Sequence, residues 1–229
     1  MYYPLYYTPN FFDNADEIRQ WAMGLEYHKP KDGRYPGART KQLHTVDNNF
    51  YDFTHLKILS LIYGKEVGRV SWESNSFFQL IKYEDIKEDN FGWIHTDNDS
   101  MLTSIIYLTP GITNSGTSLY KSKKLGYQTK TPKSKFDYYK SGKTTKEYKN
   151  EQLEFSKNYQ KIVSINSDYN SMTAFDGGYN HGAEWDLKPG EERLTLITFF
   201  TNINAPWYSI PEMRRRTVKD DMRIEWQTI

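Results

Sequence analysis

The chain has 229 residues, enough for one domain with a sizeable buried core. Its 30 Lys and Arg balance 29 Asp and Glu, which argues against a whole-molecule field that attracts nucleic acid or membranes. It contains no cysteine, so disulfides, thiolate metal sites and a cysteine nucleophile are excluded. No stretch approaches the roughly 20 apolar residues of a membrane helix, and the start lacks a signal-peptide pattern. We therefore expect a soluble, cytoplasmic protein.

The first 72 residues predict a helical support region at the start of a single domain. Asp and Asn side chains cap helices well, and Gly commonly ends them. The expected elements are an extended segment (1–12), a helix capped within Asp13–Asp16 that ends near Gly24, a loop (28–42) and a helix from about Phe50 to Tyr63.

Residues 73–205 predict a mainly β core. Short runs rich in aromatic and β-branched residues alternate with turn residues, which is typical of a β-sandwich or barrel. Because the helices precede the strands, the order argues against the alternating units of a parallel sheet. The expected strands are Phe77–Tyr83, Trp93–Asp97, Thr103–Leu108, Ile162–Ile165, Met172–Phe175 and Leu194–Thr201.

One stretch, residues 121–150, interrupts the β pattern. It contains ten Lys against one Asp and one Glu and shows no clear periodicity. Such a composition buries little apolar surface. We therefore expect a long solvated insertion between two strands of the β region. Residues 206–229 are expected to form a C-terminal tail, with a short helix over Glu212–Trp226.

A His-x-Asp pattern, His95 and Asp97, lies in one of the expected strands. Alternate residues of a strand point to the same face, so the imidazole and the carboxylate can converge on one point. A tripeptide of this kind is a weak signal by itself, because a surface histidine beside an acid is common.

Two later residues strengthen this signal. His181 follows an expected strand and a turn, and Arg193 opens another strand, on the same face as Thr195 and Ile197. A guanidinium inside an apolar barrel is costly unless an anion meets it, and its planar fork suits a carboxylate. Two histidines and one carboxylate leave three open positions on a metal, as in the facial triad of non-haem Fe(II) oxygenases. The pattern therefore predicts a metal site beside a carboxylate-binding arginine.

Residues 77–201 resemble the Fe(II)/2-oxoglutarate-dependent oxygenase superfamily, in particular its prolyl-hydroxylase-like branch. The segments that carry the resemblance, in the order of the family, are Phe91–Asn98, Thr103–Leu108, Gly116–Tyr120, His181 and Arg193. The resemblance implies a double-stranded β-helix, which is a jelly-roll or cupin-like barrel, with flanking N-terminal helices. It also implies Fe(II) bound by His95, Asp97 and His181, with 2-oxoglutarate and O2 as cosubstrates.

The same resemblance suggests which residues bind the cofactor. Arg193 matches the residue that pairs with the far carboxylate of 2-oxoglutarate, and Thr195 completes an Arg-x-Ser/Thr pattern seen in several members. Tyr107 matches a tyrosine that bonds the same carboxylate, and Tyr83 resembles a second tyrosine that faces the cofactor. The implied reaction hydroxylates an unactivated C–H bond and releases succinate and CO2.

Two further segments bear on the resemblance. The sequence Tyr-Pro-Gly-Ala-Arg at 35–39 is similar to a loop of uncharacterised, often viral or bacterial, members. The Lys-rich stretch 121–150 is longer than the usual connection and lies where such enzymes differ to suit their substrates. We therefore expect it to influence substrate choice rather than cofactor chemistry.

Alternatives stay open at this stage. A zinc hydrolase could use the same two histidines and one aspartate, but it would need a general base beside the metal. A non-catalytic β-barrel that binds a carboxylate ligand is the second alternative, and Arg193 could instead pair with Glu191 or Glu192 near the protein surface.

The substrate is unidentified: an amino acid, a peptide side chain or a small metabolite is favoured, nucleic acid is a further option, and no membrane partner is expected. The remaining histidines (His28, His44, His55) and the acids Asp99 and Glu184 are interpreted as packing, surface or loop residues.

Overall fold

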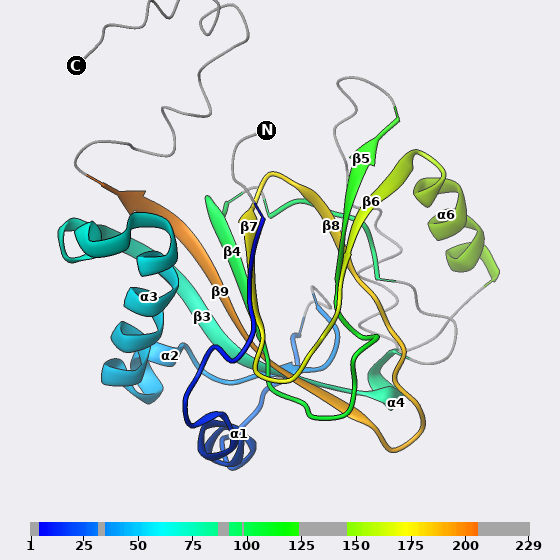
Figure 1. The fold of residues 1–229 in the computed structure, drawn as a ribbon. Coiled ribbons are helices and arrows are strands. Elements are labelled where there is room, and N and C mark those ends of the chain that lie inside the picture. Colours follow the sequence, from blue (N-terminus) through cyan, green and yellow to red (C-terminus); the bar gives the residue numbers. More distant parts are fainter. Residues whose placement is uncertain (1–4, 32–34, 87–91, 98, 124–145, 206–229) are drawn as a thin grey trace, which may run out of the picture.

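The fold comes from a computed structural model, which describes residues 5–31, 35–86, 92–97, 99–123 and 146–205. Two antiparallel sheets face each other across the molecule (Figure 1). Together they form a double-stranded β-helix, which confirms the predicted fold class. The described strands form two separate hydrogen-bonded sheets rather than one continuously closed barrel.

The larger sheet has six strands in the order β1-β7-β4-β9-β3-β2, and the smaller sheet has three in the order β6-β5-β8. All strand pairings within the two sheets are antiparallel. The strands are β1 (Tyr6–Thr8), β2 (Ala38–Arg39), β3 (Ser71–Lys82), β4 (Leu102–Tyr107), β5 (Thr117–Ser122), β6 (Tyr159–Ile165), β7 (Met172–Asp176), β8 (Asn180–Ala183) and β9 (Glu192–Asn204).

Helices from the first third of the chain cover the outer face of the larger sheet (Figure 1). The Asp47 carboxylate caps the longest of them by accepting the Phe50 N–H at 2.9 Å, and Gly64 ends it with a φ of 54°. The helical elements are α1 (Ala15–Met23), α2 (Leu43–Val46), α3 (Asn48–Tyr63), η1 (Gly64–Arg69), α4 (Tyr83–Ile86) and α6 (Lys146–Ser156). None of the helices in the described ranges has the length and apolar character needed to cross a membrane.

The strand period divides the larger sheet into two different faces. Phe78, Leu194 and Leu196 are fully buried against α1 and α3 in the main core. The residues that alternate with them, such as Ile81 and Arg193, line a cavity between the two sheets. Burying each large apolar side chain contributes about 1.5–3 kcal/mol, so the helical face stabilises a sheet whose other face is open for chemistry.

Several predicted boundaries are wrong, while the two long N-terminal helices are confirmed. Residues 93–97 form no strand. Within this segment only His95 makes a β-bridge, and its partner is His181. Strand β8, which carries His181, is absent from the sequence prediction, and Tyr83 begins α4 instead of ending a strand.

The predicted limits of the Lys-rich insertion are also wrong at both ends. Residues 121 and 122 complete β5, and residues 146–150 belong to α6. Phe155 of this helix packs with Trp93 and Tyr159 on the outer side of the smaller sheet. The rest of the insertion (124–145) and the predicted tail helix (212–226) lie outside the described residues.

Candidate metal centre

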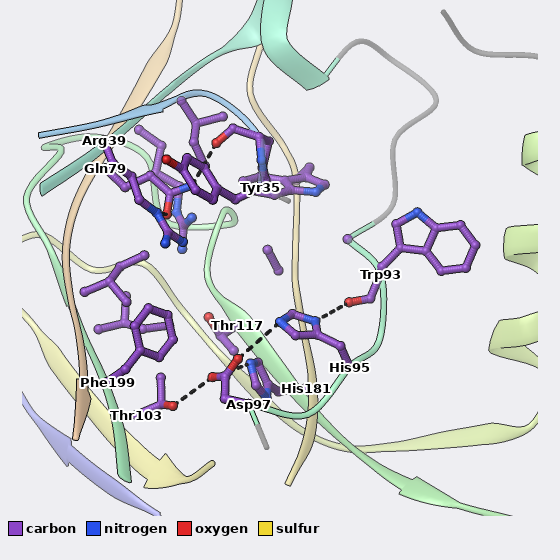
Figure 2. A pocket seen from close by; sticks show the side chains of 18 residues that line it. Tyr35, Arg39, Gln79, Trp93, His95, Asp97, Thr103, Thr117, His181 and Phe199 are labelled. Atoms are coloured by element: carbon purple, nitrogen blue, oxygen red, sulfur yellow. Dashed lines mark hydrogen bonds and ion pairs between the residues drawn. The ribbon is translucent and has the colours of Figure 1, made fainter. Parts of the chain in front are cut away.

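Two imidazoles and one carboxylate converge at one side of the cavity. His95, Asp97 and His181 each offer a ligand atom, and these three atoms lie within 4.8 Å of one another. His181 is on β8, whereas His95 is held beside it by two backbone hydrogen bonds of 2.8 Å. Figure 2 shows the two rings and the carboxylate directed toward one another. The arrangement has the donor set of a metal site with open positions.

Both histidines have a fixed tautomer. The Nδ1 atom of His95 lies 2.8 Å from the Trp93 carbonyl oxygen, and Nδ1 of His181 lies 2.9 Å from that of Tyr179. A carbonyl oxygen can only accept, so each Nδ1 carries a hydrogen, and in the neutral ring each Nε2 has a lone pair for a metal. Metal-binding histidines are commonly oriented by such a bond on the other ring nitrogen.

Asp97 is held as an anion between the rings. Its Oδ2 atom accepts the Thr103 hydroxyl at 2.8 Å and lies 3.3 Å from His181 Nε2, and its Oδ1 atom lies 3.7 Å from His95 Nε2. Burial favours the neutral acid, but the charges of His181 and His95 and the Thr103 bond outweigh it and hold the pKa of Asp97 well below its usual range. With both rings neutral, the two Nε2 lone pairs and the Asp97 carboxylate become three acceptors at one point, a donor set that suits a metal cation in place of the ring protons.

Gly177, in the turn that follows β7, allows the Asp97 segment to pack closely against this turn. The Gly177 carbonyl accepts the Asp97 N–H at 2.8 Å. A Cβ added at Gly177 would lie 2.1 Å from the Ser100 carbonyl oxygen and 2.8 Å from that of Asp97. Any side chain there would push the Asp97 segment away from β7, so Gly177 helps to position the carboxylate.

The cavity beside the triad has a volume of about 380 Å³ and is lined from both sheets. Its walls are mostly apolar, with Ile105 and Ile197 from the larger sheet and Ala183 from the smaller one. A few polar groups in an apolar cleft of this size are typical of a site for small molecules.

Arg193 lies in this cavity, and no acidic side chain of the described residues forms an ion pair with it. The residue is 4% exposed, and its guanidinium carbon lies 5.2 Å from the Tyr107 ring centre and 5.3 Å from the Trp185 ring centre. Burial lowers the pKa of Arg193, and Tyr107 opposes that shift. Its Nε has no hydrogen-bond partner, and neither Glu191 nor Glu192 forms an ion pair with it in the described part of the chain. An unpaired buried guanidinium of this kind is expected to bind an incoming anion.

The other predicted cofactor residues lie at different depths. Thr195 is buried two residues along β9 from Arg193, and within the described ranges its hydroxyl has no hydrogen-bond partner. Tyr107, opposite Thr195 on β4, donates its hydroxyl to Thr117 Oγ1 at 2.9 Å, and burial raises its pKa. Tyr83 packs with Ile81 in a separate cluster, and of the four predicted cofactor residues only Arg193 is among the residues that line the cavity.

The sequence interpretation missed Arg39, Gln79, Thr103 and Trp185, which also line the cavity. The Tyr-Pro-Gly-Ala-Arg segment was the signal for the first of these. The acids near the triad behave as predicted for loop or surface residues: Asp99 is exposed, and the Glu184 carboxylate contacts Ser118 and Lys161.

Comparison with known proteins gives a family. The profile of DUF6445, described as a family of unknown function, matches residues 2–200. The chain belongs to this family. No curated protein matches the sequence.

Solved structures share the fold of this DUF6445 protein at low sequence identity. HygX from Streptomyces hygroscopicus, with nickel and 2-oxoglutarate bound, is 11% identical over 90% of this chain and 84% of its own, with a TM-score of 0.53. The epimerase SnoN, in complex with Fe3+, alpha ketoglutarate and nogalamycin RO, is 14% identical over 88% and 80%, with a TM-score of 0.53. An oxidoreductase of the 2OG-Fe(II) oxygenase family from Burkholderia pseudomallei is 12% identical over 86% and 83%, with a TM-score of 0.50. The DUF6445 chain therefore has the fold of these three proteins.

Proposed function

We propose that this DUF6445 protein is an Fe(II)- and 2-oxoglutarate-dependent dioxygenase of the prolyl-hydroxylase-like type. The observation that carries the proposal is the presence, in one cavity, of the His95–Asp97–His181 cluster and a buried arginine that has no acidic partner among the described residues. The cluster calls for a cation, and Arg193 calls for a carboxylate. A divalent metal with a chelating dicarboxylate meets both demands at once.

The donor set fits this assignment. His95, Asp97 and His181 would hold the iron, with both Nε2 lone pairs directed at it and Asp97 oriented by Thr103. The far carboxylate of 2-oxoglutarate would be bound by Arg193 and by Thr195; among the described residues neither the Nε of Arg193 nor the hydroxyl of Thr195 has a hydrogen-bond partner. When bound, iron and 2-oxoglutarate supply the oxidation of a C–H bond by O2, with release of succinate and CO2.

The remaining residues prepare the cavity for this chemistry. Tyr107 holds Thr117 at the cavity wall, and its ring packs beside the guanidinium of Arg193. Ile105 and Ile197 line the cavity that holds the arginine and the triad, and their apolar side chains disfavour water there. A drier cavity strengthens the ionic contact between Arg193 and a carboxylate.

The described residues that line the cavity lack a group that a zinc hydrolase would need. Asp97 is the one acidic side chain among the described residues that line the cavity, and it already belongs to the cluster. A hydrolase would have no second carboxylate there to serve as a general base, and it would leave Arg193 without a role.

The test is a direct assay of cosubstrate use. The purified protein is loaded with Fe(II) without oxygen, and succinate is then measured after addition of 2-oxoglutarate and O2. Slow succinate formation that requires Fe(II), 2-oxoglutarate and O2 is the expected result. Absence of 2-oxoglutarate binding by the iron-loaded protein, measured by calorimetry, would overturn the proposal.

A further inference from the structure

A second arginine, Arg39, lines the cavity opposite the triad. It lies at the end of β2, where its backbone is aligned with Gln79 on β3. Figure 2 shows Arg39, Gln79 and Tyr35 together on one wall, with His95, Asp97 and His181 on the other side of the space. The proposed function assigns no task to this wall.

The Arg39 side chain is firmly positioned. Its Nε donates to Gln79 Oε1 at 3.2 Å, and Gln79 Nε2 donates in turn to the Pro36 carbonyl at 2.8 Å. Its guanidinium carbon lies 3.7 Å from the centre of the Tyr35 ring and 5.1 Å from that of Phe77. Stacking and the Nε bond fix the plane of the guanidinium, as in preorganised anion sites.

The part of the guanidinium that could bind a ligand is free. Within the described ranges Arg39 forms no ion pair, and its terminal nitrogens make no hydrogen bond to protein. The residue is partly exposed, and it lines the cavity. Burial lowers the pKa of Arg39 to about 10, so it remains a cation at neutral pH.

Glycine geometry explains how the loop brings this cation to the cavity. Gly37, two residues before Arg39, has a φ of 70°, which favours glycine. A Cβ at Gly37 would lie 2.2 Å from the Leu80 carbonyl oxygen. The Tyr-Pro-Gly-Ala-Arg segment can therefore press against β3 only with glycine at this position.

Charge balance indicates what Arg39 is for. Among the described residues that line the cavity, Asp97, Arg39 and Arg193 carry fixed charges. With the cofactors of the proposed function in place, Fe(II), dianionic 2-oxoglutarate, Asp97 and Arg193 sum to zero. The charge of Arg39 is then left over, and a partly buried cation without an anion is unfavourable.

We propose that Arg39 binds a carboxylate of the substrate, so that the enzyme acts on organic acids whose apolar part lies between Arg39 and the triad. The inference rests on the proposed function, because the charge count includes its cofactors. A carboxylate supplies the single negative charge that is missing, whereas a phosphate monoester would bring about −1.5 to −2. The rings of Tyr35, Phe77 and Phe199 offer an apolar surface beside the guanidinium.

Binding of simple probes tests this assignment without knowledge of the natural substrate. The protein is loaded with Ni(II) and saturating 2-oxoglutarate, which prevents turnover, and calorimetry compares benzoate, its neutral analogue benzamide and phenyl phosphate. We expect benzoate to bind at least tenfold more tightly than benzamide and more tightly than phenyl phosphate. Equal affinity for benzoate and benzamide would overturn the inference, and tighter binding of phenyl phosphate would overturn the choice of a carboxylate.

Variants then locate the probe. Arg39→Gln should weaken benzoate binding at least tenfold, to the level of benzamide, and Arg39→Lys by a smaller factor because it keeps the charge without the planar fork. The matched control is Arg69→Gln, at the end of η1 and outside the cavity, which should leave benzoate binding unchanged. Because Arg39→Gln removes a residue packed on Tyr35, Arg39→Lys also serves as the measurement if the first variant does not fold.

The two proposals fail in different ways. If Arg39→Gln weakens 2-oxoglutarate binding as strongly as benzoate binding, Arg39 belongs to the cosubstrate site and the inference is wrong. We expect its effect on 2-oxoglutarate affinity to stay within threefold, while Arg193→Gln removes that affinity. If the nickel-loaded wild-type protein binds no 2-oxoglutarate, the proposed function fails. The preference for benzoate over benzamide, and its loss in Arg39→Gln, are measured in the same titrations and test Arg39 separately.

Discussion

The Nε2 atom of His181 lies 3.3 Å from Oδ2 of Asp97, and the opposite nitrogen of the same ring lies 2.9 Å from a backbone carbonyl oxygen. Two residues that are 84 positions apart thus meet with their lone pairs directed at a common point. Antiparallel pairing of β8 with β5, and the bridge between His181 and His95, produce this meeting.

The first prediction concerns metal binding. His181→Ala should weaken Fe(II) or Co(II) binding by more than about a hundredfold, because it removes one of three ligands, a larger loss than that of an outer-shell partner. The control is His44→Ala, which changes an exposed histidine on α2. Calorimetry without oxygen measures both. Unaltered affinity in His181→Ala would show that the cluster is not the metal site.

The second prediction concerns the residue that orients Asp97. Thr103→Val keeps the shape of the side chain but removes the 2.8 Å bond to Oδ2, so metal affinity should fall about 10–100-fold. The matched control is Thr54→Val, because Thr54 is equally buried in α3 and its hydroxyl has no partner among the described residues. A metal affinity that changes equally in both variants would assign the effect to general packing.

The sequence predicts the site better than it predicts the elements that carry it. His95, Asp97 and Arg193 stand out because their chemistry is unusual for their surroundings, and this holds whether or not the segment around His95 is a strand. The strand assignment there is wrong because its hydrogen bonds go alternately to His181 and Gly177, a tertiary arrangement without a local signal.

Arg39 shows why the rest of the site could not be predicted. Its strand has only two residues, and its partner Gln79 is 40 positions away, so no periodicity marks its orientation. Thr103 is similar: its contact with Asp97 depends on how β4 enters the sheet and not on the identity of its neighbours. Tyr83 illustrates the converse, since a resemblance in sequence placed it near the cofactor whereas the chain turns into α4 at that residue.

The third prediction separates the contribution of Arg193 to 2-oxoglutarate binding from its effect on the stability of the ligand-free protein. Arg193→Met should leave the melting temperature of the ligand-free protein unchanged or raised, because replacing a buried ion by an apolar side chain is often neutral or stabilising. It should also abolish stabilisation by 2-oxoglutarate, since loss of a buried charge pair costs about 3–5 kcal/mol of binding. Thermal unfolding of the nickel-loaded protein, with and without 2-oxoglutarate, measures both effects. An equal shift by 2-oxoglutarate in variant and wild type would assign the carboxylate to another residue.

The fourth prediction uses two buried threonines whose hydroxyls have no hydrogen-bond partner in the described part of the chain. If Thr195 donates to the carboxylate of 2-oxoglutarate, Thr195→Val should weaken 2-oxoglutarate binding about tenfold, the usual value of one hydrogen bond to a charged group. Thr54→Val should have no such effect, because Thr54 lies in α3 away from the cavity. Metal binding should be the same in both variants. A tenfold loss in neither would remove Thr195 from the proposed site.

The last prediction concerns pH and a histidine outside the site. His55 is fully buried: its Nδ1 lies 2.6 Å from the Tyr51 carbonyl oxygen, and its Nε2 lies 2.7 Å from Ser74 Oγ. Burial lowers the pKa of His55 to about 4, below its unfolded value of 6.5, so the unfolded chain binds more protons between these values. The contribution of neutral His55 is therefore complete above pH 6.5 and is lost as the pH falls toward 4, at a total of about 3 kcal/mol. Urea unfolding at pH 7 and pH 4 should show a smaller loss of stability in His55→Gln than in wild type, whereas His44→Gln should match wild type. Equal losses in His55→Gln and wild type would mean that protonation of His55 does not contribute to acid destabilisation.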